Sequence, residues 1–483
     1  MKSQFSTFCL IVLCTVYHCA RSQQLNFYNP PDDDARKYTE WISATEKRYK
    51  QDLSSLTGRN KKFLVELYKE RYERIKKMYD QNEIVGSAEA TAYLQKLYST
   101  IAQANPVLQP LETRIAFSRT WWPNASSMGE GTILFNIGLF HKLQNESQAA
   151  FVICHELAHL YLNHSNNSIN RYVNTVTSDE FKKELKRINS SQYQQGQQLE
   201  SLLTSLISGS RRHSREYEAE ADSMALEWLK NTGFDVQHVL SCLQLLDSVD
   251  HDKYHINPPL NKLFHFSEYP FQEKWVKEEK SLFTAMAAST EEEAKKGMDS
   301  LKTHPDCKAR IAKLQARVEQ YRQPAGKPFV VNEQLFHKLQ TEFDYEIIDY
   351  CYRTGNISRS LYYTLQLLQL QPHNAYLVTN TGRCLNELYT AQKEHVLSHR
   401  VDMPSPYNDN DYNTLLQFIQ RLRLGDLAAF CYYFLKPYEQ GFSTHEDFLH
   451  ALIGSKANFN KPDEMKRWIS VYNKQFPNGK YKF

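Results

Sequence analysis

Hydrophobic and polar residues follow a helical period over most of the chain. Charged helical patterns cover residues 34–56 and 59–79, and a further helix is expected at residues 87–104. The pattern then changes to that of strands, because residues 113–119 alternate between polar and apolar side chains, and a second strand is expected at residues 131–136 after the turn at Gly129 and Gly131. Two strands in a mostly helical chain predict a mainly α fold with a small β-sheet.

The helical pattern resumes after these strands. One long and largely apolar helix is expected at residues 147–164, followed by polar sequence rich in Gln and Ser up to about residue 209. A second strong helix is expected at residues 214–230. Between residues 233 and 300 the pattern is helical but interrupted by prolines, and the proline-bounded segment 324–328 indicates a linker.

Residues 330–483 are predicted to form an α-helical region of paired helices. The pairs are separated at Gly355-Asn356 and at residues 372–374, which are turn-forming sequences. One helix carries an apolar stripe made of Ile357, Leu361, Leu365 and Leu368. Gly382 falls about where the next unit of a tetratricopeptide-type repeat would have a small residue. A tetratricopeptide-like region is therefore predicted from a single clear unit.

The N-terminus is typical of an export signal. An apolar core runs from Phe8 to Ala20, and a further small residue follows at Ser22. This core is shorter than the roughly 20 apolar residues that span a bilayer. Cleavage after Ser22 would leave Gln23 as the first residue, and a retained anchor helix is the alternative. The mature chain is expected to have no transmembrane span. It is expected in a periplasm or outside the cell, either free or associated with a membrane.

Composition narrows the classes of function. The 58 basic and 55 acidic residues give a net charge of +3 and are spread along the chain, so no clustered surface for nucleic acid is expected. Three of the nine cysteines fall within the signal, and the other six form no CxxC pair: Cys154, Cys242, Cys307, Cys351, Cys384 and Cys431. Six widely spaced cysteines in so long a chain do not predict a disulfide framework.

The strongest chemical motif is His155-Glu156-Leu157-Ala158-His159. On a helix, residues four apart lie on one face, so the two imidazoles can bind one Zn²⁺ while Glu156 points toward a metal-bound water. Zinc lowers the pKa of that water to about 7, and Glu156 can take its proton. The alternative is an exposed helix that carries two histidines by chance. Apolar residues 149–153 argue against it, because buried histidines need partners.

A catalytic zinc site needs a third protein ligand. His164 follows His159 by five residues, whereas the metzincin pattern needs six, so His164 is interpreted as a packing residue or as a support for a ligand. Glu218 and Asp222 share a helix face, where one carboxylate can bind zinc while the other accepts a hydrogen bond from a ligand imidazole. The alternative is a solvated acidic face, but the apolar residues among and after these acids favour a packed helix.

The HExxH motif followed by SRxxExxAD at residues 214–222 resembles the HtpX-like and CAAX-prenyl-protease-type zinc metalloendopeptidases, which belong to the gluzincin class. Residues 131–139 are similar to the edge strand and following turn of that family, which hold extended substrates by backbone pairing. Residues 303–311 are similar to its HPxxxxRI segment. The resemblance covers residues 87–314. It implies a gluzincin-type peptidase domain, here in a chain without the transmembrane helices of the membrane-bound members.

Carried over by position, the resemblance implies one Zn²⁺ per chain. His155, His159 and Glu218 would be its ligands, Glu156 the general base, and Asp222 the support of a ligand.

Other residues are candidates for contacts in the cleft or with the transition state. Arg215, Tyr217, His213 and His304 could each stabilise the oxyanion, and the sequence does not choose among them. His304 could touch substrate or block the metal, or it could simply begin a helix before Pro305.

The sequence patterns and the resemblance together divide the chain into a signal (1–22), an N-terminal helical segment (23–86), a zinc metallopeptidase domain (87–322) and the helical region (330–483). The expected function is hydrolysis of peptide bonds in exported proteins that are unfolded or misassembled. A protein partner could bind the C-terminal helices. One alternative is a binding or assembly factor with a latent zinc site. Another is a hydrolase of non-peptide substrates, which would need a closed pocket. The complete motif set favours the peptidase.

Overall fold

The structure, a computed structural model, covers most of the chain. It describes residues 28–31, 35–191, 195–248, 259–276, 307–322, 324–405 and 408–483. The predicted signal and His304 lie outside the described residues. The chain divides into an N-terminal unit (Pro31–Asp250 and Leu301–Phe343) and a C-terminal unit (Met1–Pro30, His251–Ser300 and Asp344–Phe483).

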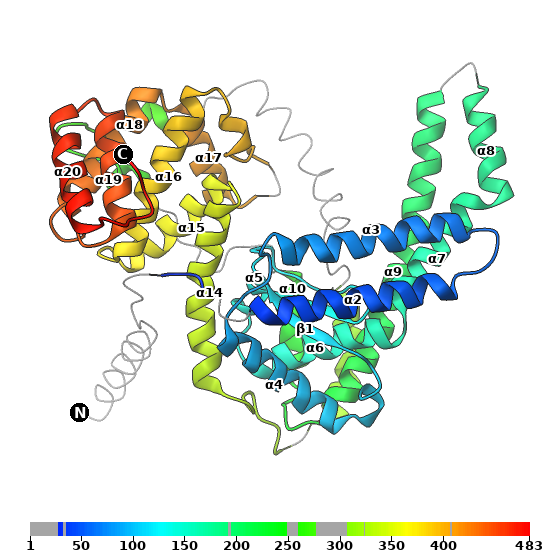
Figure 1. Ribbon diagram of the computed structural model, residues 1–483. Helices are drawn as coiled ribbons and strands as arrows, with labels where there is room; N and C mark the ends of the chain where they lie inside the picture. The colour runs from blue at the N-terminus through cyan, green and yellow to red at the C-terminus, as the bar shows by residue number, and fades with distance from the viewer. Residues whose placement is uncertain are drawn as a thin grey trace, which may run out of the picture. The chain divides into compact units, whose positions relative to one another are not determined.

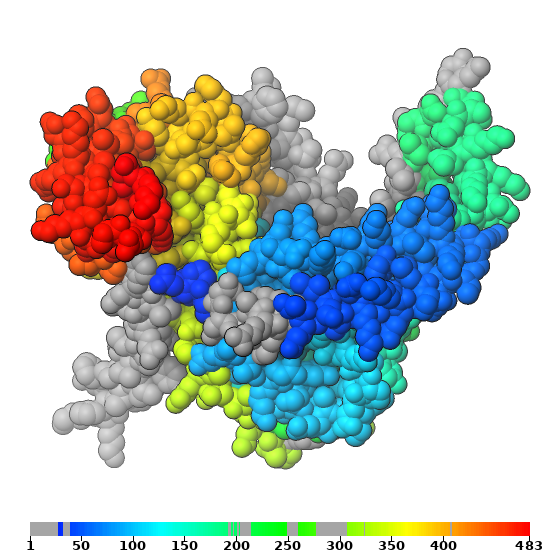
Figure 2. Space-filling model, in the orientation of Figure 1, coloured from blue at the N-terminus to red at the C-terminus, as the bar shows by residue number. Residues whose placement is uncertain are grey.

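The N-terminal unit consists mainly of helices around a small sheet. Its described helices are α2 (Ala35–Ser55), α3 (Lys61–Asp80), α4 (Ala88–Ala104), η1 (Pro106–Leu108), α5 (Ile137–Phe140), α6 (Glu146–Tyr161), α7 (His164–Thr177), α8 (Asp179–Asn189), α9 (Gln195–Leu229), α10 (His238–Asp247) and α13 (Cys307–Gln320). The three helices expected before residue 105 are confirmed as α2, α3 and α4. Helices α2 and α3 pack side by side and form the blue surface of this unit in the views shown (Figures 1 and 2).

The sheet has three strands in the described part of the chain. They are β1 (Arg114–Ser118), β2 (Ala125–Ser127) and β3 (Thr132–Asn136), in the order β1-β3-β2. Strand β3 is parallel to β1 and antiparallel to β2. The two predicted strands are confirmed, but the interpretation of residues 131–139 as an edge strand is wrong. Four of the five residues of β3 are buried, as expected for a central strand, and the short β2 is the outer strand.

The long helix predicted at residues 147–164 ends earlier than expected. Asn163 has a left-handed backbone with φ of 57°, which asparagine tolerates better than most residues, and α7 begins at His164. Most of the described residues in the polar stretch up to residue 209 form helices α7, α8 and the first part of α9, which the sequence pattern did not predict. Helix α8 and the first half of α9 run side by side there (Figure 1). Gln and Ser do not prevent helix formation when a neighbouring helix packs alongside.

The N-terminus of α6 is anchored by a fully buried carboxylate. Glu146 accepts hydrogen bonds from Tyr93 Oη at 2.9 Å and from the backbone N–H groups of residues 330–332 at 2.6–2.8 Å. The neighbouring Ser147 Oγ donates to the carbonyl oxygen of Lys327 at 2.8 Å. These hydrogen bonds hold residues 327–332 against the start of α6, so the segment predicted as a linker is fixed there.

The C-terminal unit is helical. Its described helices are α11 (Leu260–Leu263), η2 (Glu273–Trp275), α15 (Ile357–Leu370), α16 (Ala375–Lys393), η3 (Leu397–His399), α17 (Asn410–Arg421), α18 (Leu424–Leu435), η4 (Lys436–Tyr438), α19 (Glu446–Asn458) and α20 (Pro462–Gln475). Helix α14 (Glu333–Arg353) contains the boundary between the two units. Among the described residues, no helix combines the length and hydropathy that crossing a bilayer requires.

The predicted apolar stripe of α15 lies in the core of this unit. Ile357, Leu361, Leu365 and Leu368 are all buried. At Gly382 on α16, a Cβ atom would lie 2.7 Å from Leu435 Cδ1 on α18, so a larger residue would require the Leu435 side chain to move. Phe264 and Trp275 also belong to this core, at 5.2 and 5.0 Å from the ring of Phe430. The tetratricopeptide-like arrangement stays a prediction.

Candidate metal centre

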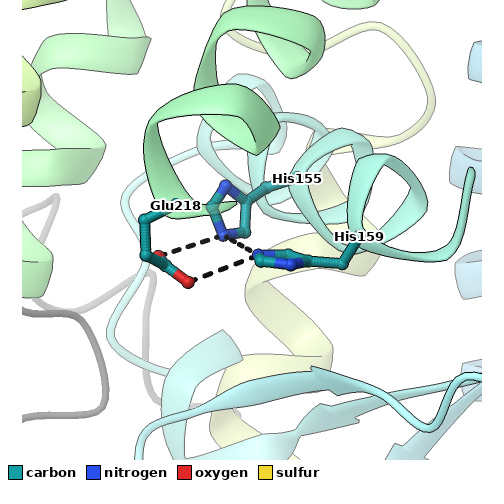
Figure 3. Close-up of side chains that lie close together, drawn as sticks. All are labelled: His155, His159 and Glu218. Atoms are coloured by element: carbon teal, nitrogen blue, oxygen red, sulfur yellow. Dashed lines mark hydrogen bonds and ion pairs between the residues drawn. The ribbon is translucent and has the colours of Figure 1, made fainter. Parts of the chain in front are cut away.

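Helices α6 and α9 bring three metal-ligating side chains together. His155 and His159 lie one turn apart on α6, and Glu218 points toward both of them from α9 (Figure 3). The two Nε2 atoms are 3.0 Å apart. Glu218 Oε2 lies 3.4 Å from His155 Nε2, and Glu218 Oε1 lies 3.3 Å from His159 Nε2. The three residues predicted as ligands are therefore adjacent in the structure.

These distances fit a small tetrahedral cation. Ligand atoms about 2.0–2.1 Å from a tetrahedral Zn²⁺ are about 3.3–3.4 Å apart, close to the separations at this site. Glu218 Oε2 is buried, and Arg310 Nη1 lies 3.1 Å from it, but within the described part of the chain no hydrogen bond of good geometry reaches it. A bound cation would stabilise this buried carboxylate oxygen further. The donor set and its geometry therefore suit a metal ion.

Asp222 orients the imidazole of His155. Its carboxylate is buried, one turn after Glu218 on α9, and Oδ1 lies 2.9 Å from His155 Nδ1. A carboxylate at this distance favours a proton on Nδ1, which leaves the lone pair of Nε2 free for a metal. The geometry agrees with the supporting position predicted for Asp222.

Arg310 on α13 was not assigned to this site from the sequence. It is buried, and its Nε and Nη2 atoms each donate to the Asp222 carboxylate at 2.6 Å. Its Nη1 atom lies 3.1 Å from Glu218 Oε2. The arginine of the HPxxxxRI segment was the signal that could have indicated this role. One guanidinium thus balances two buried carboxylates, which would otherwise be very costly to bury.

The charges at this site are strongly coupled in the absence of a metal. Burial favours a neutral Glu218, but His155, His159 and Arg310 together outweigh burial and hold the pKa of Glu218 well below its ordinary value. Burial likewise opposes the charge of Asp222, but Arg310 and His155 together outweigh burial and lower the pKa of Asp222. Burial lowers the pKa of His155, but Asp222 and Glu218 outweigh burial and raise it to about 10. The pocket therefore presents ionised carboxylates to a cation.

Comparison with protein families identifies the domain that contains this site. Residues 88–318 match the model of peptidase family M48. The domain belongs to peptidase family M48. The protein is therefore a metallopeptidase whose substrates are polypeptides, and the family resemblance and the mainly α fold with a small sheet are confirmed. Comparison with curated proteins found no match to this chain.

Glu156 of the M48 domain lies directly after the first ligand-type histidine on α6 and is 5% exposed. Together with His155 it borders a small cavity of about 10 Å³, roughly the space of one water molecule. The apolar walls of this cavity are Leu139, Phe151, Val152 and Leu246. Glu156 is therefore held in a packed and largely apolar environment beside the candidate metal ligands.

His164 of the M48 domain contacts the other histidine of the motif. Its Nδ1 atom lies 3.0 Å from His159 Nδ1, and its ring stacks on Tyr217 with centroids 4.1 Å apart. The Tyr217 hydroxyl accepts a hydrogen bond from Arg171 at 3.0 Å. Tyr217, a candidate for a cleft contact, therefore packs against His164 on the side of His159 away from the other ligands.

The remaining candidates for contacts with substrate are less well defined. Arg215 lies on α9 and is exposed. His304 and the side chain of His213 lie outside the part of the chain that the structure describes. The residue that stabilises the oxyanion therefore remains unassigned among the described residues.

Proposed function

We propose that the M48 domain is a zinc-dependent endopeptidase with one Zn²⁺ per chain, held by His155, His159 and Glu218. The observation that supports this most directly is the convergence of these side chains at separations of 3.0–3.4 Å. Zn²⁺ bound there would act as a Lewis acid and lower the pKa of a bound water. Glu156 would accept a proton from the attacking water and return it to the leaving amine.

This proposal is tested by removing and restoring the metal. Purified protein should cleave unfolded casein, lose this activity after treatment with a chelator, and recover it when about one equivalent of Zn²⁺ is added. If the purified protein holds zinc and does not cleave casein or a peptide library, the site is latent, and the alternative of a binding factor is favoured.

We propose that extended substrates pair with the outer strand β2, which contacts α6. Asn124 and Met128 exchange backbone hydrogen bonds with β3 on the inner side: Asn136 N–H donates to the Asn124 carbonyl at 3.0 Å, and Met128 N–H donates to the Thr132 carbonyl at 2.8 Å. Backbone groups alternate in direction along an antiparallel strand, so those of Ala125 and Ser127 face outward. Among the described residues, no strand pairs with this outer side.

Replacing Ser127 by Pro should weaken substrate binding without removing the metal. Proline deletes an N–H group that faces away from β3, so the sheet keeps its hydrogen bonds. One hydrogen bond to substrate contributes about 1 kcal/mol, which corresponds to a factor of about five in kcat/KM. Steady-state cleavage of a fluorogenic peptide measures this effect, and Ser127→Ala is the matched control. Unchanged kcat/KM in Ser127→Pro would contradict pairing at β2.

The class and location of the substrate are part of the same proposal. The apolar N-terminal stretch supports export to a periplasm or to the outside of the cell. Pairing with an edge strand requires an extended segment, which unfolded or misassembled proteins expose. We therefore propose that the natural substrates are exported polypeptides in a non-native state. A partner that binds the C-terminal helices stays a proposal without a specific contact.

A further inference from the structure

A row of three polar side chains leads away from the metal centre on the side of His159. His159 Nδ1 lies 3.0 Å from His164 Nδ1, and His164 Nε2 lies 3.1 Å from Glu220 Oε2. The side chain of His164 is 4% exposed, whereas that of Glu220 is 60% exposed. The row therefore connects a candidate metal ligand through a buried imidazole to a carboxylate at the surface.

The chemistry of imidazole permits one proton arrangement in this row when His159 binds a metal. Its Nε2 atom must then present a lone pair, so its proton is on Nδ1 and is donated to Nδ1 of His164. His164 consequently carries its proton on Nε2, which faces the acceptor oxygen of Glu220. Every nitrogen in the row has a partner of the correct kind.

The surrounding structure fixes the ring of His164. The left-handed residue Asn163 ends the turn after α6, so α7 starts with His164 beneath His159. Tyr217 stacks on His164 with an interplanar angle of 13°, and Arg171 donates a hydrogen bond to the Tyr217 hydroxyl. A buried ring held on one face and at both nitrogens has little rotational freedom, so it can fix the orientation of its neighbour.

We propose that His164 is a positioning residue for the metal ligand His159, with Glu220 as the acceptor at the end of the row. This inference rests on the proposed zinc site. The two imidazole ligands are then supported unequally, because His155 has the buried Asp222 and Arg310 behind it, whereas His159 has an imidazole and an exposed carboxylate. Loss of the row should therefore loosen the His159 side of the site.

The test is the zinc affinity of variants that separate packing from hydrogen bonding. His164→Phe keeps a ring to stack on Tyr217 but removes both nitrogens, and it should raise the Kd for Zn²⁺ by about 10- to 100-fold. His164→Asn can present an oxygen to His159 and should recover part of the affinity. Glu220→Gln should cause a smaller loss because its side chain is exposed. Glu180→Gln, an exposed acid on α8, is the control and should match the parent.

The readouts are competition with a chromophoric chelator and the visible spectrum of the protein loaded with Co²⁺. The account predicts a shifted Co²⁺ spectrum in His164→Phe, together with unchanged thermal unfolding of the metal-free protein. If His164→Phe binds Zn²⁺ as tightly as the parent and gives the same Co²⁺ spectrum, His164 only packs, and the inference is wrong. If the parent itself binds no zinc, the proposed function fails instead.

Discussion

Glu156→Gln should lower kcat/KM for casein-derived peptides by about 10²- to 10⁴-fold, the usual contribution of a general base, while zinc content stays unchanged. Glutamine has nearly the same volume as glutamate, so it should fit the packed position that Glu156 occupies at 5% exposure. Its amide cannot accept a proton at neutral pH. Peptide cleavage and metal analysis of the same protein sample measure the two effects together.

Two outcomes would contradict the role of Glu156. Cleavage at more than about a tenth of the parental rate would place the general base elsewhere. Loss of zinc from the variant would show that Glu156 supports the metal site. Glu180→Gln makes the same charge change at an exposed position outside the site and should retain full activity.

Arg310→Met should destabilise the metal-free protein by about 3–5 kcal/mol, because it leaves two buried carboxylates without their cation. The guanidinium contacts both Asp222 and Glu218 and is 4% exposed, so water cannot replace it easily. Zn²⁺ supplies positive charge next to Glu218 and should offset part of this loss. The rise in Tm on adding zinc should therefore be larger in the variant than in the parent. Thermal unfolding with and without zinc measures both quantities.

The control for this prediction is Arg322→Met. Arg322 follows α13 and is 65% exposed, and its ion pair with Glu319 is long, at 3.6 Å. Surface pairs of this kind contribute about 0–1 kcal/mol, so the Tm of this variant should change little. If Arg310→Met and Arg322→Met are equally stable, Arg310 is not needed to stabilise the buried carboxylates of Asp222 and Glu218.

The metal ligands could be predicted from the sequence because their spacing is local. Residues four apart share one face of a helix wherever that helix lies in the fold. This applies to His155 and His159, and also to Glu218 and Asp222. Their pairing across 59 residues came from the family pattern and not from periodicity. Arg310 could not be assigned in this way, since its role depends on how α13 packs against α9. His164 was predicted to pack or to support a ligand, but the sequence alone did not indicate that it contacts His159 and Glu220.

The small sheet was predicted only in part for a similar reason. Strand β1 lies in an alternating segment and β3 contains a short apolar run, whereas β2 contains only Ala125, Ser126 and Ser127 and carries no such signal. The short segment of β2 is a strand because it pairs with β3, and this pairing places β2 at the edge of the sheet and β3 in the centre. Helices α7 and α8 and the first part of α9 were not predicted, because the sequence there was described only by its polar composition, although neighbouring helices contact them.

The central claim is tested most directly by the zinc content of the purified protein and of Glu218→Ala. The account predicts about one Zn²⁺ per chain in the parent and a large loss in the variant, because two imidazoles alone hold zinc weakly. A parent protein without zinc, or a Glu218→Ala variant that binds zinc as tightly as the parent, would contradict the proposed site.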